Sequence, residues 1–250
     1  MSTVASPTRL PVRELADQFA RQLIPLGSTF SYFSTIPLPE EEIQQYLHEP
    51  IAALPPALCI FLAKVGIILA PYLEKGNGKE GELAAFEKPE ESRRIFGTHL
   101  KSETDSMLVL AVKDEDMADY HFAFYNAIAA LAADRLSEEA QEPFSKLLRE
   151  ELAAEAHGEV DEKSWHLKQS LTRRQANARK ETKLFRDYAK QSFEDTLTLY
   201  LHGICCDIDV ETGPRQIASR HLRKRLELLE SMFPPPDGYA VFPELGKKRR

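Results

Sequence analysis

The chain has 250 residues and a mass of 28.3 kDa, enough for one large domain or two small ones. Its 43% hydrophobic and 28% charged residues are ordinary for a globular chain and exclude a disordered or collagen-like protein. The net charge of −7, from 32 basic and 39 acidic residues, excludes a wholly basic nucleic-acid binder.

The charge is divided unevenly along the chain. The part before Ser164 has 15 basic and 28 acidic side chains and the rest has 17 and 11, so the two parts carry −13 and +6. This split favours docking of the parts on each other, binding of an acidic partner, or differently solvated faces. Three cysteines, no signal-peptide pattern and a lysine, Lys64, inside the one long apolar run predict a soluble cytoplasmic protein without a membrane segment.

The N-terminal part predicts two helices and a strand. Apolar side chains at spacings of three and four predict an amphipathic helix over Pro11–Leu23. Aromatic and hydroxyl side chains over Thr29–Thr35 predict a short strand. Pro39 precedes three glutamates and predicts a helix start, because proline presets the backbone angle and carboxylates face the positive end of the helix dipole. Pro50 is expected to end that helix.

Three apolar runs bounded by turn residues or charges predict buried strands. A glycine-rich stretch at 76–81 predicts a hairpin loop between the first two runs, since glycine and asparagine tolerate positive φ. A crossover helix is expected near Glu90–Leu100, before the third run. The runs are Val65–Leu73, Glu82–Glu87 and Met107–Val112.

After Val112 the apolar residues recur with the 3.6-residue period of an α-helix. We expect one helix over about 118–136, another beginning near Ser137, a long one ending near 204 and a last one over about 215–232. The long helix carries an aromatic and leucine stripe that we expect to pack against the helix of Phe122 and Tyr125. The stripe consists of Phe185, Phe193, Leu197 and Tyr200.

These elements predict an α+β fold. A small mixed sheet from about 29 to 112 is expected to pack against a larger C-terminal helical region from about 115 to 232. The chain then divides into a mixed part, 1–113, and a helical part, 114–250. We expect the two parts to form one compact unit rather than two independent domains.

Two stretches contain histidine, cysteine or carboxylate side chains of the types that bind metal ions. Zinc is the metal that we would expect such a site to hold. His202 and Cys206 lie one helical turn apart, and zinc favours imidazole with thiolate. A second stretch concentrates imidazoles and carboxylates, as metal ligands in a helical bundle require. Each stretch also has a purely structural interpretation, which we prefer. The first would be a helix end packed on the core, and the second a solvated acidic face. The second set of candidate ligands is His157, Glu159, Glu162 and His166.

No catalytic motif is complete in the sequence. His121 follows the strand predicted at Met107–Val112, the order found in zincin-type peptidases. Those enzymes need His-Glu-x-x-His, and the stretch from His121 to Tyr125 lacks the glutamate and the second histidine. Phosphate loops and nucleophile elbows are also missing.

Basic side chains form two clusters at helical spacing in the C-terminal third. Acidic side chains interleave with both and lower the local potential, so protein docking is the better expectation and nucleic acid is not the expected partner. The interaction candidates are Arg179, Lys183, Arg186, Lys190, Arg220, Arg223 and Lys224.

We therefore expect a non-catalytic protein-interaction or assembly module that binds a protein partner or associates with itself. The first alternative is a metal-dependent enzyme, zincin-like or with a His, Cys and carboxylate site in a helical bundle. The second alternative is nucleic-acid binding through the basic C-terminal helices. The sequence identifies neither a substrate nor a partner.

Overall fold

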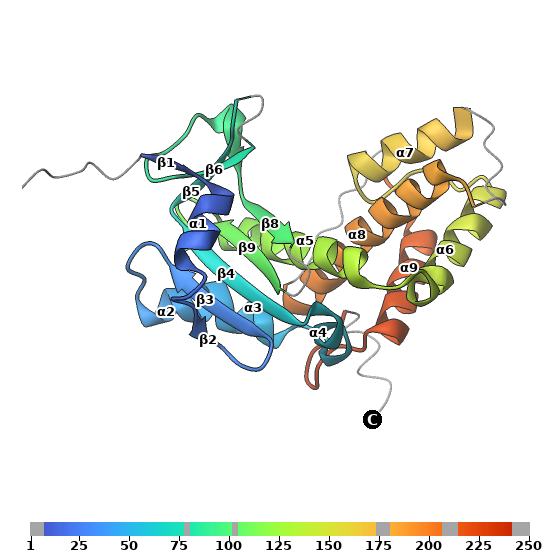
Figure 1. Cartoon of the computed structure of the whole chain (residues 1–250). Coiled ribbons are helices and arrows are strands. Elements are labelled where there is room, and N and C mark those ends of the chain that lie inside the picture. Colours follow the sequence, from blue (N-terminus) through green and yellow to red (C-terminus); the bar gives the residue numbers. More distant parts are fainter. Residues whose placement is uncertain (1–7, 78–80, 102–104, 174–180, 207–214, 242–250) are drawn as a thin grey trace, which may run out of the picture. The chain divides into compact units, whose positions relative to one another are not determined.

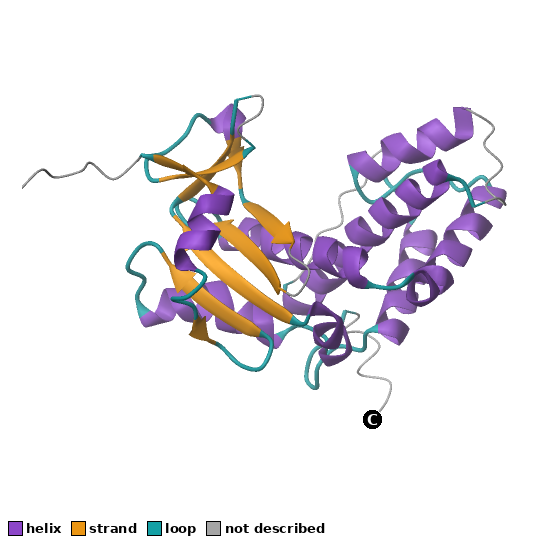
Figure 2. Cartoon of the chain, viewed as in Figure 1, coloured by secondary structure: helices purple, strands orange, loops and turns teal. Residues whose placement is uncertain are grey.

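The computed structural model of the chain describes residues 8–77, 81–101, 105–173, 181–206 and 215–241. Two small sheets with short helices occupy the N-terminal part, and longer helices follow from Met117 onward (Figures 1 and 2). The α+β fold class is therefore confirmed.

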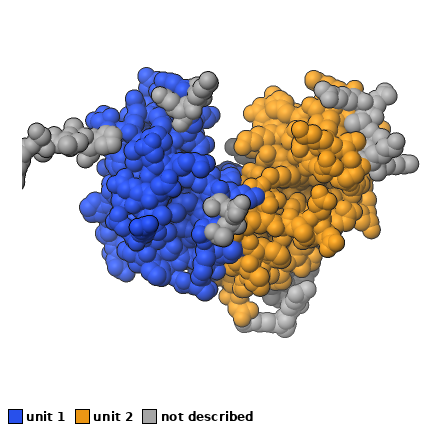
Figure 3. Space-filling model, in the orientation of Figure 1, with its two compact units in different colours: residues 1–52, 62–127 blue, residues 53–61, 128–250 orange. Residues whose placement is uncertain are grey.

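The chain forms two compact units, coloured separately in Figure 3. The division between them falls inside helix α5 (Met117–Arg135), whereas the sequence pattern predicted a boundary between 113 and 114. The first unit contains residues 1–52 and 62–127, and the second contains 53–61 and 128–250.

The main sheet of the first unit has five strands in the order β2-β3-β4-β9-β8. β3, β4 and β9 are parallel neighbours, and β2 and β8 pair antiparallel at the two edges. β4 and β9 are apolar on both faces, as strands covered on two sides are. The predicted strands near 29–35 and 107–112 are confirmed. The bounds are β2 Ile24–Pro25, β3 Phe30–Ser34, β4 Lys64–Ala70, β8 Gly97–Lys101 and β9 Asp105–Ala111.

A second, antiparallel sheet has the order β1-β6-β5-β7. The apolar run Val65–Leu73 contributes to both sheets because Pro71, which cannot donate a ladder hydrogen bond, separates β4 from β5. β5 and β6 form the hairpin predicted around 76–81, where Gly81 has a φ of +70°. The bounds are β1 Arg9–Pro11, β5 Tyr72–Lys75, β6 Glu82–Ala85 and β7 Arg94–Ile95.

The crossover helix expected near Glu90–Leu100 is wrong. After a single 3-10 turn at Glu91–Arg93, this stretch forms β7 and β8. Thr98 is buried on one side of β8, with Gly97 and His99 as less buried neighbours. This alternation of burial has the two-residue period of a strand. Pairing with β9 provides hydrogen bonds for the backbone of β8, so no helix is needed.

Helix α1 (Val12–Phe19) covers one face of the main sheet, where Val12 and Leu15 pack with Ile68 of β4 and Val109 of β9. The helix predicted to begin after Pro39 consists of three segments. The expectation that Pro50 ends it is wrong, because Pro50 lies inside the last segment. The segments are α2 (Glu40–Ile43), a π-helical turn (Gln44–His48) and α3 (Glu49–Ala52).

The second unit consists of helices and the loops that join them (Figure 1). Ser137 caps α6 as predicted, accepting a 3.2 Å hydrogen bond from the Ala140 N–H. Thr182 caps α8 in the same way through the Phe185 N–H at 3.1 Å. The helices are α4 (Pro56–Leu62), the end of α5, α6 (Glu138–Ala153), α7 (Glu162–Arg173), α8 (Lys183–Cys205) and α9 (Ser219–Met232).

The stripe on α8 is buried, as expected, and one of its rings packs on α6. Phe193 meets Phe144 of α6 edge to face, with ring centroids 5.3 Å apart. On α5, Phe122 is 44% exposed and Tyr125 is fully buried. The four stripe residues, Phe185, Phe193, Leu197 and Tyr200, are all buried. Among the described helices, none combines the length and the apolar character needed to cross a lipid bilayer.

Candidate functional site

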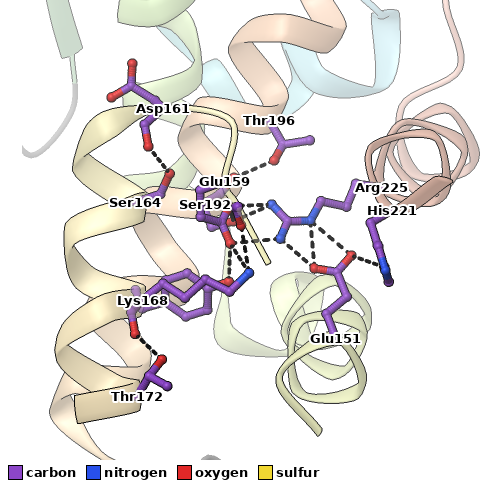
Figure 4. A network of polar contacts seen from close by, with 12 residues as sticks. Glu151, Glu159, Asp161, Ser164, Lys168, Thr172, Ser192, Thr196, His221 and Arg225 are labelled. Carbon is purple, nitrogen blue, oxygen red and sulfur yellow. Dashed lines mark hydrogen bonds and ion pairs between the residues drawn. The ribbon is translucent and has the colours of Figure 1, made fainter. Parts of the chain in front are cut away.

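A fully buried arginine lies at the centre of the helical unit. The Arg225 side chain extends from α9 toward two buried carboxylates, Glu151 on α6 and Glu159 in the loop before α7 (Figure 4). Its Nη1 donates to Glu159 Oε2 at 2.7 Å, and its Nε donates to Glu151 Oε2 at 3.1 Å. Nη1 also donates to the Ser192 hydroxyl of α8 at 2.9 Å. One side chain therefore joins three helices and a loop.

Glu159 accepts hydrogen bonds from two further side chains. Lys168 of α7 donates from Nζ to Oε1 at 3.1 Å, and the Tyr188 hydroxyl of α8 donates to the same oxygen at 2.5 Å. Burial alone would raise the pKa of Glu159, but the charges of Arg225 and Lys168 and the donated hydrogen bonds lower that pKa to about 2. Glu159 is thus ionised and its oxygens are occupied by protein donors.

The network is balanced in charge. Two cations, Arg225 and Lys168, face two carboxylates, Glu151 and Glu159, and all four side chains are buried. A buried ion pair of this kind adds little net stability compared with apolar packing, but removal of one member leaves an uncompensated charge at a cost of about 3–5 kcal/mol. The network therefore fixes how α6, α7, α8 and α9 meet rather than leaving groups free for a reaction.

The other candidate ligands of this region lie at the surface. His157 is exposed and packs edge-on against Trp165, with ring centroids 5.0 Å apart. His166 and Glu162 are both exposed on α7, with His166 Nε2 and Glu162 Oε1 3.4 Å apart. Glu162 also pairs with Arg215 at 3.2 Å. The helical spacing of Glu162 and His166 is confirmed, but it places them on the solvated face.

His202 and Cys206 mark the end of α8. Cys206 is the first residue beyond the helix, with extended backbone angles, and its N–H donates to the His202 carbonyl at 2.8 Å. None of the three cysteines, Cys59, Cys205 and Cys206, forms a disulfide in the described part of the chain. Within the described residues, no three of the six candidate ligands form a group that could hold a metal ion. These six are His157, Glu159, Glu162, His166, His202 and Cys206.

The basic candidates are exposed where the structure describes them. Lys183, Arg186 and Lys190 lie within the first turns of α8, and Lys190 pairs with Asp134 of α5. Arg179 lies outside the described residues. The second cluster is on α9, where Arg223 pairs with Glu227 at 3.0 Å. The remaining members of that cluster, Arg220 and Lys224, are also exposed.

A groove open to solvent lies beside the first basic cluster, with a volume of about 460 Å³. It is formed by the end of α5, the start of α6 and the start of α8. Small and branched apolar side chains provide part of its lining, and four acidic and two basic side chains provide most of the rest. The lining includes Ala133, Leu136, Ala189, Glu138, Glu142, Glu181, Asp187, Arg186 and Lys190.

Ion pairs neutralise only part of this lining. Arg149 pairs with Glu142 and with Glu181, and its guanidinium lies 4.5 Å from the centre of the Phe185 ring. Glu138 and Asp187 have no ion pair within the described residues. The sequence indicated Arg186 and Lys190 but not the acidic lining, because those carboxylates come from α6 and from the start of α8, which are distant in sequence.

The first unit has its own charged cluster, beyond the carboxyl ends of β4 and β9. Asp114, with a positive φ of 59°, accepts a hydrogen bond from the Tyr72 hydroxyl at 3.1 Å and pairs with Lys88 at 2.9 Å. These donors lower the pKa of Asp114. Arg94 pairs with Glu115, and burial raises the pKa of Glu115. Each charge has a partner of opposite sign, so the cluster joins the two sheets.

Comparison of the chain with family models, with curated proteins and with solved structures found no match.

Proposed function

We propose that the chain is a non-catalytic protein-interaction module whose helical unit binds a short segment of a partner protein in the groove beside α8. The observation that carries this proposal is the groove itself. Its volume of about 460 Å³ falls in the range of pockets that accept a ligand or several side chains. Two of its walls, α6 and α8, are joined by the buried Arg225 network through Glu151 and Ser192.

The lining defines the chemistry of the bound segment. Ala133, Leu136 and Ala189 offer an apolar surface on which an aliphatic or aromatic side chain packs. Glu138 and Asp187, without ion pairs in the described part of the chain, favour a lysine or arginine beside it. The lining carries four acidic and two basic groups, so its net charge of −2 attracts a basic segment. The partner segment therefore combines a basic residue with an apolar anchor.

The test is a selection of peptides from a random library on the purified full-length chain. Selected peptides are expected to combine lysine or arginine with an apolar residue and to bind with an affinity that falls as salt rises. The variant pair Glu138→Lys and Asp187→Lys is expected to weaken their binding at least tenfold. Glu139→Lys is the matched control, because Glu139 is exposed on the same turn of α6 but does not line the groove.

Two results would contradict the proposal. One is a selection that yields no peptide with this combination. The other is a set of peptides whose affinity changes equally in Glu139→Lys and in the two groove variants, because general charge repulsion would then explain the loss. Thermal melting of each variant verifies that the helical unit stays folded during these measurements.

A further inference from the structure

Asp195 is a buried carboxyl group that the Arg225 network does not use. It lies in the middle of α8 and is 6% exposed. Its Oδ1 accepts a 2.8 Å hydrogen bond from the Gln191 side chain, one turn earlier. Its Oδ2 is buried and has no hydrogen-bond partner among the described residues. A buried carboxylate oxygen without a donor is costly, whereas a protonated carboxyl needs only an acceptor.

An acceptor is available on the neighbouring helix. The Ser164 side chain of α7 is completely buried and lies beside the Asp195 carboxyl. The Ser164 hydroxyl donates its own hydrogen to the Asp161 carbonyl at 3.0 Å, so its oxygen keeps lone pairs for another donor. A neutral Asp195 can donate its proton to that oxygen, whereas the ionised form cannot. The Ser164 contact alone lowers the pKa of Asp195, so the preference for the neutral form comes from burial.

The charges around Asp195 oppose its ionisation. Asp161 at the start of α7 and Glu194 on α8 both act on it with negative charge. The buried cations on the other helices that contact α8 are bound elsewhere: Lys168 of α7 and Arg225 of α9 face Glu159, and Arg225 also faces Glu151 of α6. Burial, followed by the effect of these carboxylates, outweighs the Ser164 and Gln191 contacts and raises the pKa of Asp195 to about 6.

We propose that Asp195 is a proton-dependent latch between α7 and α8. When the carboxyl is neutral, it donates to the Ser164 oxygen and holds α7 against α8. When it releases its proton to solvent, an unpaired negative charge is left in the helix contact, and α7 loosens. Because α7 also carries Lys168, loosening withdraws one cation from the buried network around Glu159.

The direction of the pH effect follows from linkage. The pKa of Asp195 is raised in the folded protein, from 3.8 to about 6, so the folded state binds this proton more tightly than the unfolded state. The stabilisation is complete below about pH 4 and is lost as the pH rises to about 6. A difference of about two pKa units changes the equilibrium between held and loosened α7 by up to about a hundredfold.

Amide hydrogen exchange of α7 tests the latch in the full chain. After correction for intrinsic rates, the opening of Glu162–Arg173 is expected to increase about tenfold between pH 5 and pH 7.5. Asp195→Asn keeps the shape and the donor of the neutral acid, so its α7 protection is expected to be the same at both pH values. Glu139→Gln, at an exposed carboxylate of α6 that does not line the groove, is expected to behave as the unmodified chain does.

Equal protection of α7 at pH 5 and 7.5 in the unmodified chain would overturn the proposal. So would a pH dependence that persists in Asp195→Asn. A carboxyl carbon NMR titration of the unmodified chain provides a measurement that does not depend on a folded variant. A titration of Asp195 near pH 6 supports the latch, and a titration below about pH 4.5 rejects it.

Discussion

The hydroxyl of Tyr120 donates a 2.9 Å hydrogen bond to the backbone carbonyl of Tyr46. Tyr46 is four residues before Pro50, which has no N–H to donate to that carbonyl in a helix. Tyr120 therefore supplies, from α5, a donor that the proline lacks. Tyr125 donates in turn to the carbonyl of Pro50 itself at 3.1 Å. These side-chain donors, together with the π-helical turn before it, accommodate Pro50 within the helical segment.

The Tyr120→Phe substitution is expected to lower the free energy of unfolding by about 1–3 kcal/mol, because it removes a buried donor and keeps the ring. Chemical denaturation measures this loss. In a Pro50→Ala background, which restores a backbone N–H, the loss should be smaller. Equal losses in the two backgrounds would show that the Tyr120 hydroxyl does not compensate for the proline.

Replacement of Arg225 by methionine is expected to cost about 3–5 kcal/mol, since two buried carboxylates lose their main partner. Arg223→Met is the control, because Arg223 is exposed and its pair with Glu227 is worth at most about 1 kcal/mol. Urea denaturation of both variants gives the comparison. Similar midpoints for the two would mean that the Arg225 network does not hold the helical unit together.

Acid is expected to weaken the network through Glu159. The pKa of this group is lowered from 4.5 to about 2 in the folded state, so its contribution is present above about pH 4.5 and is lost as the pH falls toward 2. The full contribution is on the order of 3 kcal/mol. The difference in unfolding free energy between the unmodified chain and Glu159→Gln should therefore shrink over this interval. A constant difference down to pH 2 would contradict this assignment.

The α8 stripe predicts a contrast between two phenylalanines. Phe193→Ala is expected to cost about 3–5 kcal/mol, because it removes a buried ring packed on Phe144. Phe122→Ala should cost less than about 1 kcal/mol, because that side chain is 44% exposed. Denaturant unfolding of the two variants measures both values. A loss below 1 kcal/mol for Phe193→Ala would mean that the stripe contributes little to the core.

Local sequence patterns were sufficient for most elements of this chain. The apolar runs of β4 and β9, the cap at Ser137 and the period of α5, α6 and α9 depend on neighbours within a few residues, so the sequence alone predicts them. The predictions of a helix end at Pro50 and of a helix at Glu90–Leu100 were wrong, because these structures depend on residues distant in sequence. Hydroxyl donors from α5 accommodate the proline, and pairing with β9 makes β8 a strand.

In the candidate site, too, the sequence alone predicted some features and the tertiary structure decided the others. The sequence alone determined that residues 155–166 concentrate carboxylates and imidazoles and that α8 and α9 carry basic side chains. It did not determine that Glu159 points inward while Glu162 and His166 point to solvent. Nor did it distinguish the buried Arg225 from its exposed neighbours Arg223 and Lys224. Burial and charge pairing depend on contacts between residues 66 or 74 positions apart, which only the packing of α6, α8 and α9 brings together.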